Sequence, residues 1–227
     1  MTIARTRIKI CGLTREADVD TAVAAGVDAL GFVLYEKSPR HVSIDRAAEL
    51  AARLPPFVTP VLLFVNETTR RIGEACAAIP GATLQLHGDE SPSQCLAASQ
   101  GGKHPYLRVA RIPTGRSAQQ FDLVKYALDY SGAQAILLDA QVDGYGGSGQ
   151  TFNWSLLPPS VNAHLVLSGG LNTANVGDGI LRLRQRCLSL AVDVSSGVEC
   201  TGPGNKGLKD PEKIHQFVAA VRATDQA

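Results

Sequence analysis

A lysine and a cysteine stand two residues apart near the start of the chain, in the segment "RIKICG". Ile8 and Ile10 alternate with Lys9 and Cys11, as in a strand that packs its isoleucine face against helices. Lys9 and Cys11 then share the opposite face. A thiol whose pKa is lowered from about 8.5 becomes a proton acceptor, so the pair could supply a general base. A lone cysteine on a strand is more often a small buried apolar residue, and the segment alone leaves both interpretations open.

Other polar side chains stand where later apolar runs end. "LQLHGDE" carries His87, "AILLDA" carries Asp139 and "LAVDVSSG" carries Asp193. Glycines follow most of these residues, and glycine permits the close backbone approach that a cradle of N–H groups for an anion requires. The glycine-containing segments "SGGLNTANV" and "VSSGVE" are the most suitable for phosphate. A phosphorylated small molecule is the expected ligand.

Apolar runs of strand length alternate with segments of helical spacing along the whole chain. Eight runs are predicted as strands: "RIKIC", "ALGFVLY", "PVLLFVN", "TLQLHG", "YLRVARI", "AILLDA", "HLVLSGG" and "LSLAVDVSSG". Helices are predicted in "READVDTAVAAG", which closes on Gly26, in "SIDRAAELAARL" behind a Ser43 cap, and in "DPEKIHQFVAAVRA". Only a short helix is predicted near "FNWSLLP", between the sixth and seventh strands.

Eight strand-helix units in 227 residues are close to the about 250 residues of a (β/α)8 barrel. We therefore predict one α/β domain over residues 1–227 with the TIM-barrel fold. A doubly wound open sheet is the structural alternative, because alternation alone does not establish closure. In a barrel the active site lies at the carboxyl ends of the strands, and the loops after strands seven and eight most often bind phosphate. The polar residues above would then meet at one mouth.

Composition narrows the classes of partner and compartment. A formal net charge of +1 provides no long-range field for nucleic acid or an anionic membrane surface, so neither is expected as a partner. The five cysteines lie far apart without a C-x-x-C pair, which predicts neither a disulfide framework nor a zinc site. No apolar run approaches the about 18 to 20 residues of a membrane span. We expect a cytoplasmic protein, with a monomer as the default and a homodimer as the alternative.

Six segments occur in the order, and at about the spacing, of phosphoribosylanthranilate isomerase of tryptophan biosynthesis. They are "KICGLT", "GFVLYEKSPRHVS", "LQLHGDE", "LLDA" followed by "GGSG", "LSGGLN" and "VDVSSGVE". The chain resembles this family over essentially its whole length. The resemblance implies an Amadori rearrangement of N-(5'-phosphoribosyl)anthranilate to 1-(2-carboxyphenylamino)-1-deoxyribulose 5-phosphate, by acid-base catalysis and without a metal or an organic cofactor.

The resemblance also implies roles for individual residues. Cys11 would be the general base and Asp139 the general acid, while Arg40 would hold the anthranilate carboxylate. His87 and Asp193 would line the substrate site. Backbone amides around five loop residues would hold the phosphate: Gly147, Gly169, Gly170, Ser195 and Ser196. These roles make chemical sense, because a carboxylic acid can protonate the sugar ring oxygen and a thiolate can remove the proton from C2.

Lys9 shares the face of Cys11, and we hypothesise that its ammonium favours the thiolate and is itself kept charged by Asp193. The segment "GYGGSG" is expected to be a loop that folds over the substrate. Departures from the family pattern are Glu36, Ser148, Ser168 and a longer segment at 198–210. None of them falls on the proposed acid or base, and only the path of the segment 198–210 is left open.

Two rival enzymes and one non-catalytic function are weighed against this identification. The histidine-pathway isomerase uses aspartates on strands one and five, whereas here strand one offers Cys11 and "YLRVARIPTG" offers no carboxylate. Indole-glycerol-phosphate synthase would need lysines and a glutamate at strand ends, and that set is not found. A sensor that binds a phosphorylated ligand without turnover would not need Cys11 and Asp139 together.

Overall fold

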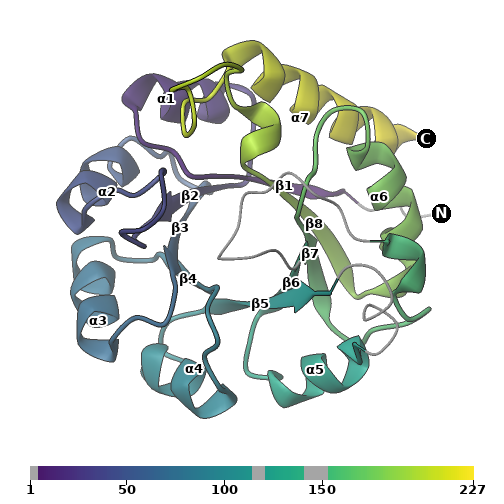
Figure 1. Ribbon diagram of the computed structural model, residues 1–227, viewed down its shortest axis with the longest axis horizontal. Helices are drawn as coiled ribbons and strands as arrows, with labels where there is room; N and C mark the ends of the chain where they lie inside the picture. Colours follow the sequence, from purple (N-terminus) through teal and green to yellow (C-terminus); the bar gives the residue numbers. More distant parts are fainter. Residues whose placement is uncertain (1–4, 114–120, 141–152) are drawn as a thin grey trace.

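Eight parallel strands form a closed barrel in sequence order in the computed structural model, which describes residues 5–113, 121–140 and 153–227 (Figure 1). The barrel closes where β1 (Arg7–Cys11) pairs with β8 (Ser189–Val194), with Lys9 opposite Asp193. The predicted (β/α)8 barrel is thereby confirmed, and the open doubly wound sheet is excluded. That residues 1–227 make up a single domain stays a prediction.

All eight predicted strands are present. The six between the closing pair are β2 (Ala29–Val33), β3 (Thr59–Phe64), β4 (Thr83–Leu86), β5 (Tyr106–Ile112), β6 (Ala135–Ala140) and β7 (His164–Leu167). Several predicted runs extend past the carboxyl end of their strand, as "LSLAVDVSSG" does beyond β8. The chain leaves the sheet at these points to form the loops of the mouth.

Helices surround the ring of strands (Figure 1). They are α1 (Glu16–Ala24), α2 (Ile44–Ala51), α3 (Thr69–Ala78), α4 (Pro92–Ala98), α5 (Leu123–Asp129), α6 (Val176–Leu183) and α7 (Pro211–Gln226). Ser43 caps α2 as predicted, because its side chain accepts the backbone N–H of Arg46. Short 3₁₀ turns are η2 (Trp154–Leu156), η3 (Arg184–Arg186) and η4 (Ser196–Val198). In the described residues between β6 and β7 the helical element is η2, a single short turn as predicted.

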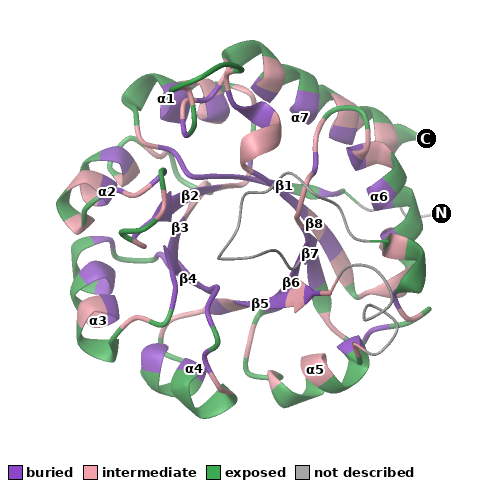
Figure 2. Cartoon of the chain, viewed as in Figure 1, coloured by how far each residue is buried: buried purple, intermediate pink, exposed green. Residues whose placement is uncertain are grey.

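The two faces of each strand meet different surroundings. Ile8 and Ile10 pack with the helices in the main apolar core, which Figure 2 shows as buried strand and inner helix surfaces. Inside the barrel, one apolar layer contains Val109, Leu137 and Val166. Polar side chains occupy the interior toward the carboxyl ends of the strands. Within the described residues, no helix is long and apolar enough to cross a membrane.

Candidate active site

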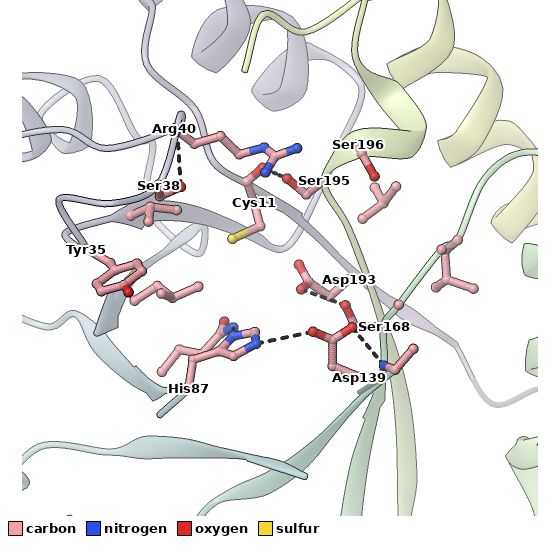
Figure 3. Close-up of a pocket in the computed structure, with 18 of the residues that line it drawn as sticks. Cys11, Tyr35, Ser38, Arg40, His87, Asp139, Ser168, Asp193, Ser195 and Ser196 are labelled. Carbon is pink, nitrogen blue, oxygen red and sulfur yellow. Dashed lines mark hydrogen bonds and ion pairs between the residues drawn. The ribbon is translucent and has the colours of Figure 1, made fainter. Parts of the chain in front are cut away.

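A cavity opens at the carboxyl ends of the strands, and side chains from widely separated parts of the sequence line it (Figure 3). Nine of the predicted site residues contribute to its lining: Cys11, Arg40, His87, Asp139, Gly169, Gly170, Asp193, Ser195 and Ser196. The tenth, Gly147, and the rest of "GYGGSG" lie outside the described residues. The fold therefore brings nine predicted residues to one cavity, while their individual roles stay predictions.

Cys11 ends β1 beside a buried ion pair. Lys9 Nζ lies 2.8 Å from Asp193 Oδ1, and both side chains are buried inside the barrel. Asp193 Oδ2 accepts a hydrogen bond from Ser168 Oγ at 3.2 Å. Gly31, on β2, leaves room for the group, because a Cβ there would lie 2.8 Å from Cys11 Sγ and 3.1 Å from Lys9 Nζ. The hypothesised pairing of Lys9 with Asp193 is confirmed.

The ionisation of Cys11 reflects two opposing influences. Burial is the larger and raises the pKa of the thiol, whereas the Lys9 ammonium lowers it through its charge and a hydrogen bond. The net pKa of Cys11 is above its ordinary value. Burial also disfavours the charged form of Lys9, but Asp193 and Cys11 outweigh it and raise the pKa of Lys9. Lys9 therefore favours the thiolate as hypothesised, but the effect of burial on the pKa of Cys11 is larger.

Asp139 is the next-to-last residue of β6 and lies close to an imidazole. Its Oδ2 lies 3.2 Å from His87 Nε2, and its Oδ1 accepts the backbone N–H of Ala140 at 3.0 Å. Gln85 Nε2 lies 3.2 Å from His87 Nδ1. An amide that donates to Nδ1 leaves the single hydrogen of a neutral His87 on Nε2, facing Asp139. Figure 3 shows His87 and Asp139 pointing toward each other at the floor of the cavity.

Arg40 follows β2 and is held by an acidic side chain from the far end of the chain. Its Nε lies 2.6 Å from Glu199 Oε1 and its Nη2 lies 3.0 Å from Glu199 Oε2. Lys209 Nζ lies 3.1 Å from Glu199 Oε1. Burial would raise the pKa of Glu199, but Arg40 and Lys209 lower it to about 2. Arg40, the predicted partner of the anthranilate carboxylate, therefore belongs to a buried cluster of three ionisable side chains with Glu199 and Lys209.

The loops after β7 and β8 form one surface of the cavity. Gly169 and Gly170 adopt positive φ angles of 78° and 65°, which glycine accommodates without strain. A Cβ at Gly169 would lie 2.8 Å from Asp139 Oδ1, and one at Gly197 would lie 1.9 Å from Leu171 O. These glycines let the two loops pack against each other and against the carboxylate. Backbone amides on such closely packed glycine loops suit a phosphate.

The opposite wall of the cavity is apolar. Val33, Leu63 and Val65 form a buried cluster with Cys11, and Tyr35 packs against it. All of these residues line the same cavity as the glycine loops. One side therefore suits an aromatic ring and the other an anion. Among the residues described, no group of three or more His, Cys, Asp or Glu side chains could hold a metal ion.

Sequence reasoning missed several members of this site. Gln85 could have been found, because it stands on β4 two residues before His87, which directly follows the strand, and alternation directs both side chains to the same side. Ser168 contacts Asp193, and the sequence shows it only as a departure from the family pattern. Glu199 and Lys209 had no local signal, since 159 residues separate Glu199 from Arg40.

Comparisons with known proteins place the chain in one enzyme family. The family model described as N-(5'phosphoribosyl)anthranilate (PRA) isomerase matches residues 8–220. The N-(5'-phosphoribosyl)anthranilate isomerase of Methylibium petroleiphilum is 58% identical over 221 residues, covering 97% of this chain and 96% of the relative.

Two solved structures have the same fold and are similar in sequence. Phosphoribosyl anthranilate isomerase from Thermotoga maritima has a TM-score of 0.80 and 36% identity, covering 96% of this chain and 99% of the other. A phosphoribosyl anthranilate isomerase in complex with reduced 1-(o-carboxyphenylamino)-1-deoxyribulose 5-phosphate has a TM-score of 0.74 and 32% identity, with the same coverage.

Proposed function

This chain belongs to the N-(5'-phosphoribosyl)anthranilate isomerase family, and from that premise we propose that Cys11 is the general base and Asp139 the general acid of its reaction. The reaction is the Amadori rearrangement of N-(5'-phosphoribosyl)anthranilate in tryptophan biosynthesis. The assignment rests on one observation: Cys11 and Asp139 line the same cavity. The apolar wall and Arg40 also line this cavity, as do the glycine loops after β7 and β8.

Asp139 acts first, in opening the sugar ring. Its carboxyl proton goes to the ring oxygen while the lone pair of the anilino nitrogen forms the C1=N iminium bond. The bond between C1 and the ring oxygen breaks, and that oxygen becomes the C4 hydroxyl. Asp139 is left as a carboxylate, which can accept a hydrogen bond from His87 Nε2 at 3.2 Å. His87 thus stabilises the product form of the acid.

Cys11 acts in the second half. Its thiolate removes the proton from C2 of the iminium, and the released electron pair forms the C1=C2 bond of a neutral enolamine. The enolamine becomes the ketone when C1 gains a proton and the C2 hydroxyl loses one. The rearrangement consumes no proton, and the enzyme is restored when one proton passes from the thiol to the carboxylate of Asp139.

The remaining lining residues would position the substrate. Arg40 would bind the anthranilate carboxylate through a planar donor edge, and the aromatic ring would lie on the apolar wall. The backbone of Gly169, Gly170, Ser195 and Ser196 would bind the phosphate, joined by Gly147 from outside the described residues. Asp193 borders the same cavity, but its two oxygens already accept from Lys9 and Ser168. We therefore assign Asp193 to the support of Lys9 as well as to the lining.

Loss of the fluorescence of the anthranilate substrate tests these roles. We expect turnover by the wild type and a fall of about 10² to 10⁴ in kcat in Cys11→Ala and in Asp139→Asn. Both variants should still bind the reduced product analogue, since neither side chain contributes the carboxylate or phosphate contacts. Wild-type rates in either variant would overturn the assignment of that residue.

We further propose a cytoplasmic location and a monomeric state. All five cysteines are free thiols, a state that a reducing compartment maintains. A homodimer is the alternative for the assembly. Light scattering on the purified chain decides between them, because a particle of twice the chain mass would overturn the monomer.

A further inference from the structure

Glu199 is a buried carboxylate that the proposed chemistry does not use. It accepts hydrogen bonds from Nε and Nη2 of Arg40, and both side chains are buried. We propose that Glu199, supported by Lys209, is a positioning residue that holds Arg40 with its remaining N–H edge available to the carboxylate of the substrate's anthranilate ring. This inference rests on the proposed role of Arg40.

The guanidinium of Arg40 has more N–H groups than Glu199 accepts. Arg40 has five N–H groups, and Glu199 takes one on Nε and one on Nη2. The edge between Nη1 and Nη2 keeps a pair of parallel donors, which is the arrangement that binds a carboxylate bidentately. Among the described residues, none accepts a hydrogen bond from Nη1. Arg40 also lines the cavity, so this edge can serve a ligand there.

The methylene groups of Arg40 pack closely against neighbouring glycines. Gly12 has a φ of 80°, and a Cβ there would lie 2.4 Å from Arg40 Cδ. On another side, a Cβ at Gly207 would lie 3.5 Å from Arg40 Cγ. The stem thus runs between two glycines. Figure 3 shows the Arg40 side chain beside Cys11 at the cavity. Glu199 is needed to fix the planar end, because packing along the methylenes leaves the rotation of the guanidinium open.

Lys209 adds a second positive charge beside Arg40 and Glu199. Glu199 alone would neutralise Arg40 and weaken its attraction for a substrate carboxylate. Lys209 is fully buried, and its Nζ lies 3.1 Å from Glu199 Oε1 and 3.0 Å from Ser195 O. Burial lowers the pKa of Lys209 against the opposing charge of Glu199. With Lys209 protonated, the cluster of Arg40, Lys209 and Glu199 carries a net charge of +1 beside the cavity. Glu199 orients the arginine, and Lys209 preserves the attraction for an anion.

Orientation of Arg40 by Glu199 and a purely electrostatic effect of Glu199 predict opposite changes in ligand affinity for Glu199→Gln. That substitution raises the cluster to +2, so electrostatic attraction alone would tighten the binding of a carboxylated ligand. Positioning predicts weaker binding, because a glutamine amide can accept from one N–H of Arg40 but presents a second donor to the other. The direction of the change therefore separates orientation from simple charge.

The test uses two ligands that differ in one group. The first is reduced 1-(o-carboxyphenylamino)-1-deoxyribulose 5-phosphate, and the second is the same molecule without the ring carboxylate. Calorimetry gives the Kd of each for the wild type, Glu199→Gln and Lys209→Met. We expect each variant to bind the carboxylated ligand about tenfold more weakly. Glu199→Gln should bind the ligand without the carboxylate within about threefold of wild type. Lys209→Met also loses the contact with Ser195 O, so for this variant the loss of affinity should be larger for the carboxylated ligand than for the other. In kinetics, Glu199→Gln should raise KM more than it lowers kcat.

A matched control separates this effect from general damage to a buried ion pair. Asp225 is also a buried carboxylate paired with an arginine, Arg184, and it accepts the backbone N–H of Thr6 just before β1. Asp225→Asn should leave both affinities unchanged in protein that is still folded. Equal losses for the two ligands in Glu199→Gln, tighter binding of the carboxylated ligand, or no change would each overturn the inference.

The wild type tests the proposed function separately. Wild-type protein that binds both ligands equally well would remove Arg40 from carboxylate binding and the inference with it. If the wild type prefers the carboxylated ligand and Glu199→Gln keeps that preference, the proposed function stands and only the inference fails. Lys209→Met gives an independent result should Glu199→Gln fail to fold, because it leaves the Arg40–Glu199 pair in place.

Discussion

Lys9 and Asp193 are register partners at the junction that closes the barrel, and their side chains form an ion pair of 2.8 Å inside it. The same ammonium acts on Cys11, the next inward-facing residue of β1. One lysine therefore contacts both the strand that closes the barrel and the proposed base. The chain length between the two partners is 184 residues, so only the closed sheet creates this relationship.

Removing the ammonium should make the thiolate harder to form. Lys9 lowers the pKa of Cys11 against a larger effect of burial, so Lys9→Met is expected to raise that pKa further. The rate of alkylation of Cys11 by iodoacetamide, followed by mass spectrometry, should then begin to rise at higher pH than in the wild type. The acid limb of kcat/KM, which reports the free enzyme, should move in the same direction.

The surface variant Lys125→Met is the control, since Lys125 is exposed and pairs with Asp129 on α5. It should leave both pH profiles where they are. An alkylation profile of Lys9→Met that coincides with that of the wild type would show that Lys9 does not act on the thiol.

Gly31 should be a position where one methyl group impairs catalysis. A Cβ there would lie 2.8 Å from Cys11 Sγ and 3.1 Å from Lys9 Nζ, so one of these groups must move. Displacement of a catalytic atom by about 1 Å commonly costs about 10² in rate. We expect Gly31→Ala to lower kcat by about that factor, measured by the fluorescence assay on protein with a native circular dichroism spectrum.

Gly73, in the middle of α3, is the matched comparison. A Cβ there would contact only Gln100 Nε2 at 3.5 Å, an ordinary distance. Gly73→Ala should keep full activity and stabilise the fold by about 0.5 to 1 kcal/mol, because alanine favours a helix over glycine. Equal activity of the two alanine variants would contradict the crowding argument at Gly31.

Acid stability should report the charge of Glu199. Arg40 and Lys209 hold its pKa at about 2 in the folded protein, below the about 4.3 of an unfolded chain. The unfolded state therefore binds more protons between these values, and the contribution of Glu199 to stability is present above pH about 4.3 and lost as pH falls toward 2. Urea unfolding of the wild type should lose stability more steeply over this interval than Glu199→Gln. Parallel curves for the two proteins would contradict the lowered pKa.

Local patterns were sufficient for the elements and for the positions of most site residues. Alternation in "RIKIC" placed Lys9 and Cys11 inside the barrel, and near-continuous apolar runs identified buried parallel strands. Polar residues at the ends of those runs then had to meet at one mouth once the sheet closed. His87 and Asp139 came together for this reason, although 52 residues separate them.

Local sequence patterns could not predict the net pKa of Cys11 or the distant partner of Arg40. The influence of Lys9 on Cys11 has the sign that the sequence suggested, but the larger effect of burial depends on how tightly the whole mouth is packed. The sequence predicts the anthranilate carboxylate as a partner of Arg40 and gives no sign of Glu199, which Arg40 binds from the segment after β8. That segment is longer than is usual in the family, and nothing local in it indicates contact with the loop after β2.

The Lys9–Asp193 pair should also be a strongly coupled element of stability. Each partner is buried, so removing one leaves the other as an uncompensated charge, at a cost of about 3 to 5 kcal/mol. Lys9→Met and Asp193→Asn should each destabilise the protein by roughly that amount in urea unfolding, while the double variant should lose much less than the sum. The exposed pair of Arg70 and Glu74 on α3 provides the contrast, since such pairs couple by only about 0.3 to 0.5 kcal/mol. Additive losses in Lys9→Met and Asp193→Asn would show that the two charges do not depend on each other, and the support of Lys9 by Asp193 would have to be abandoned.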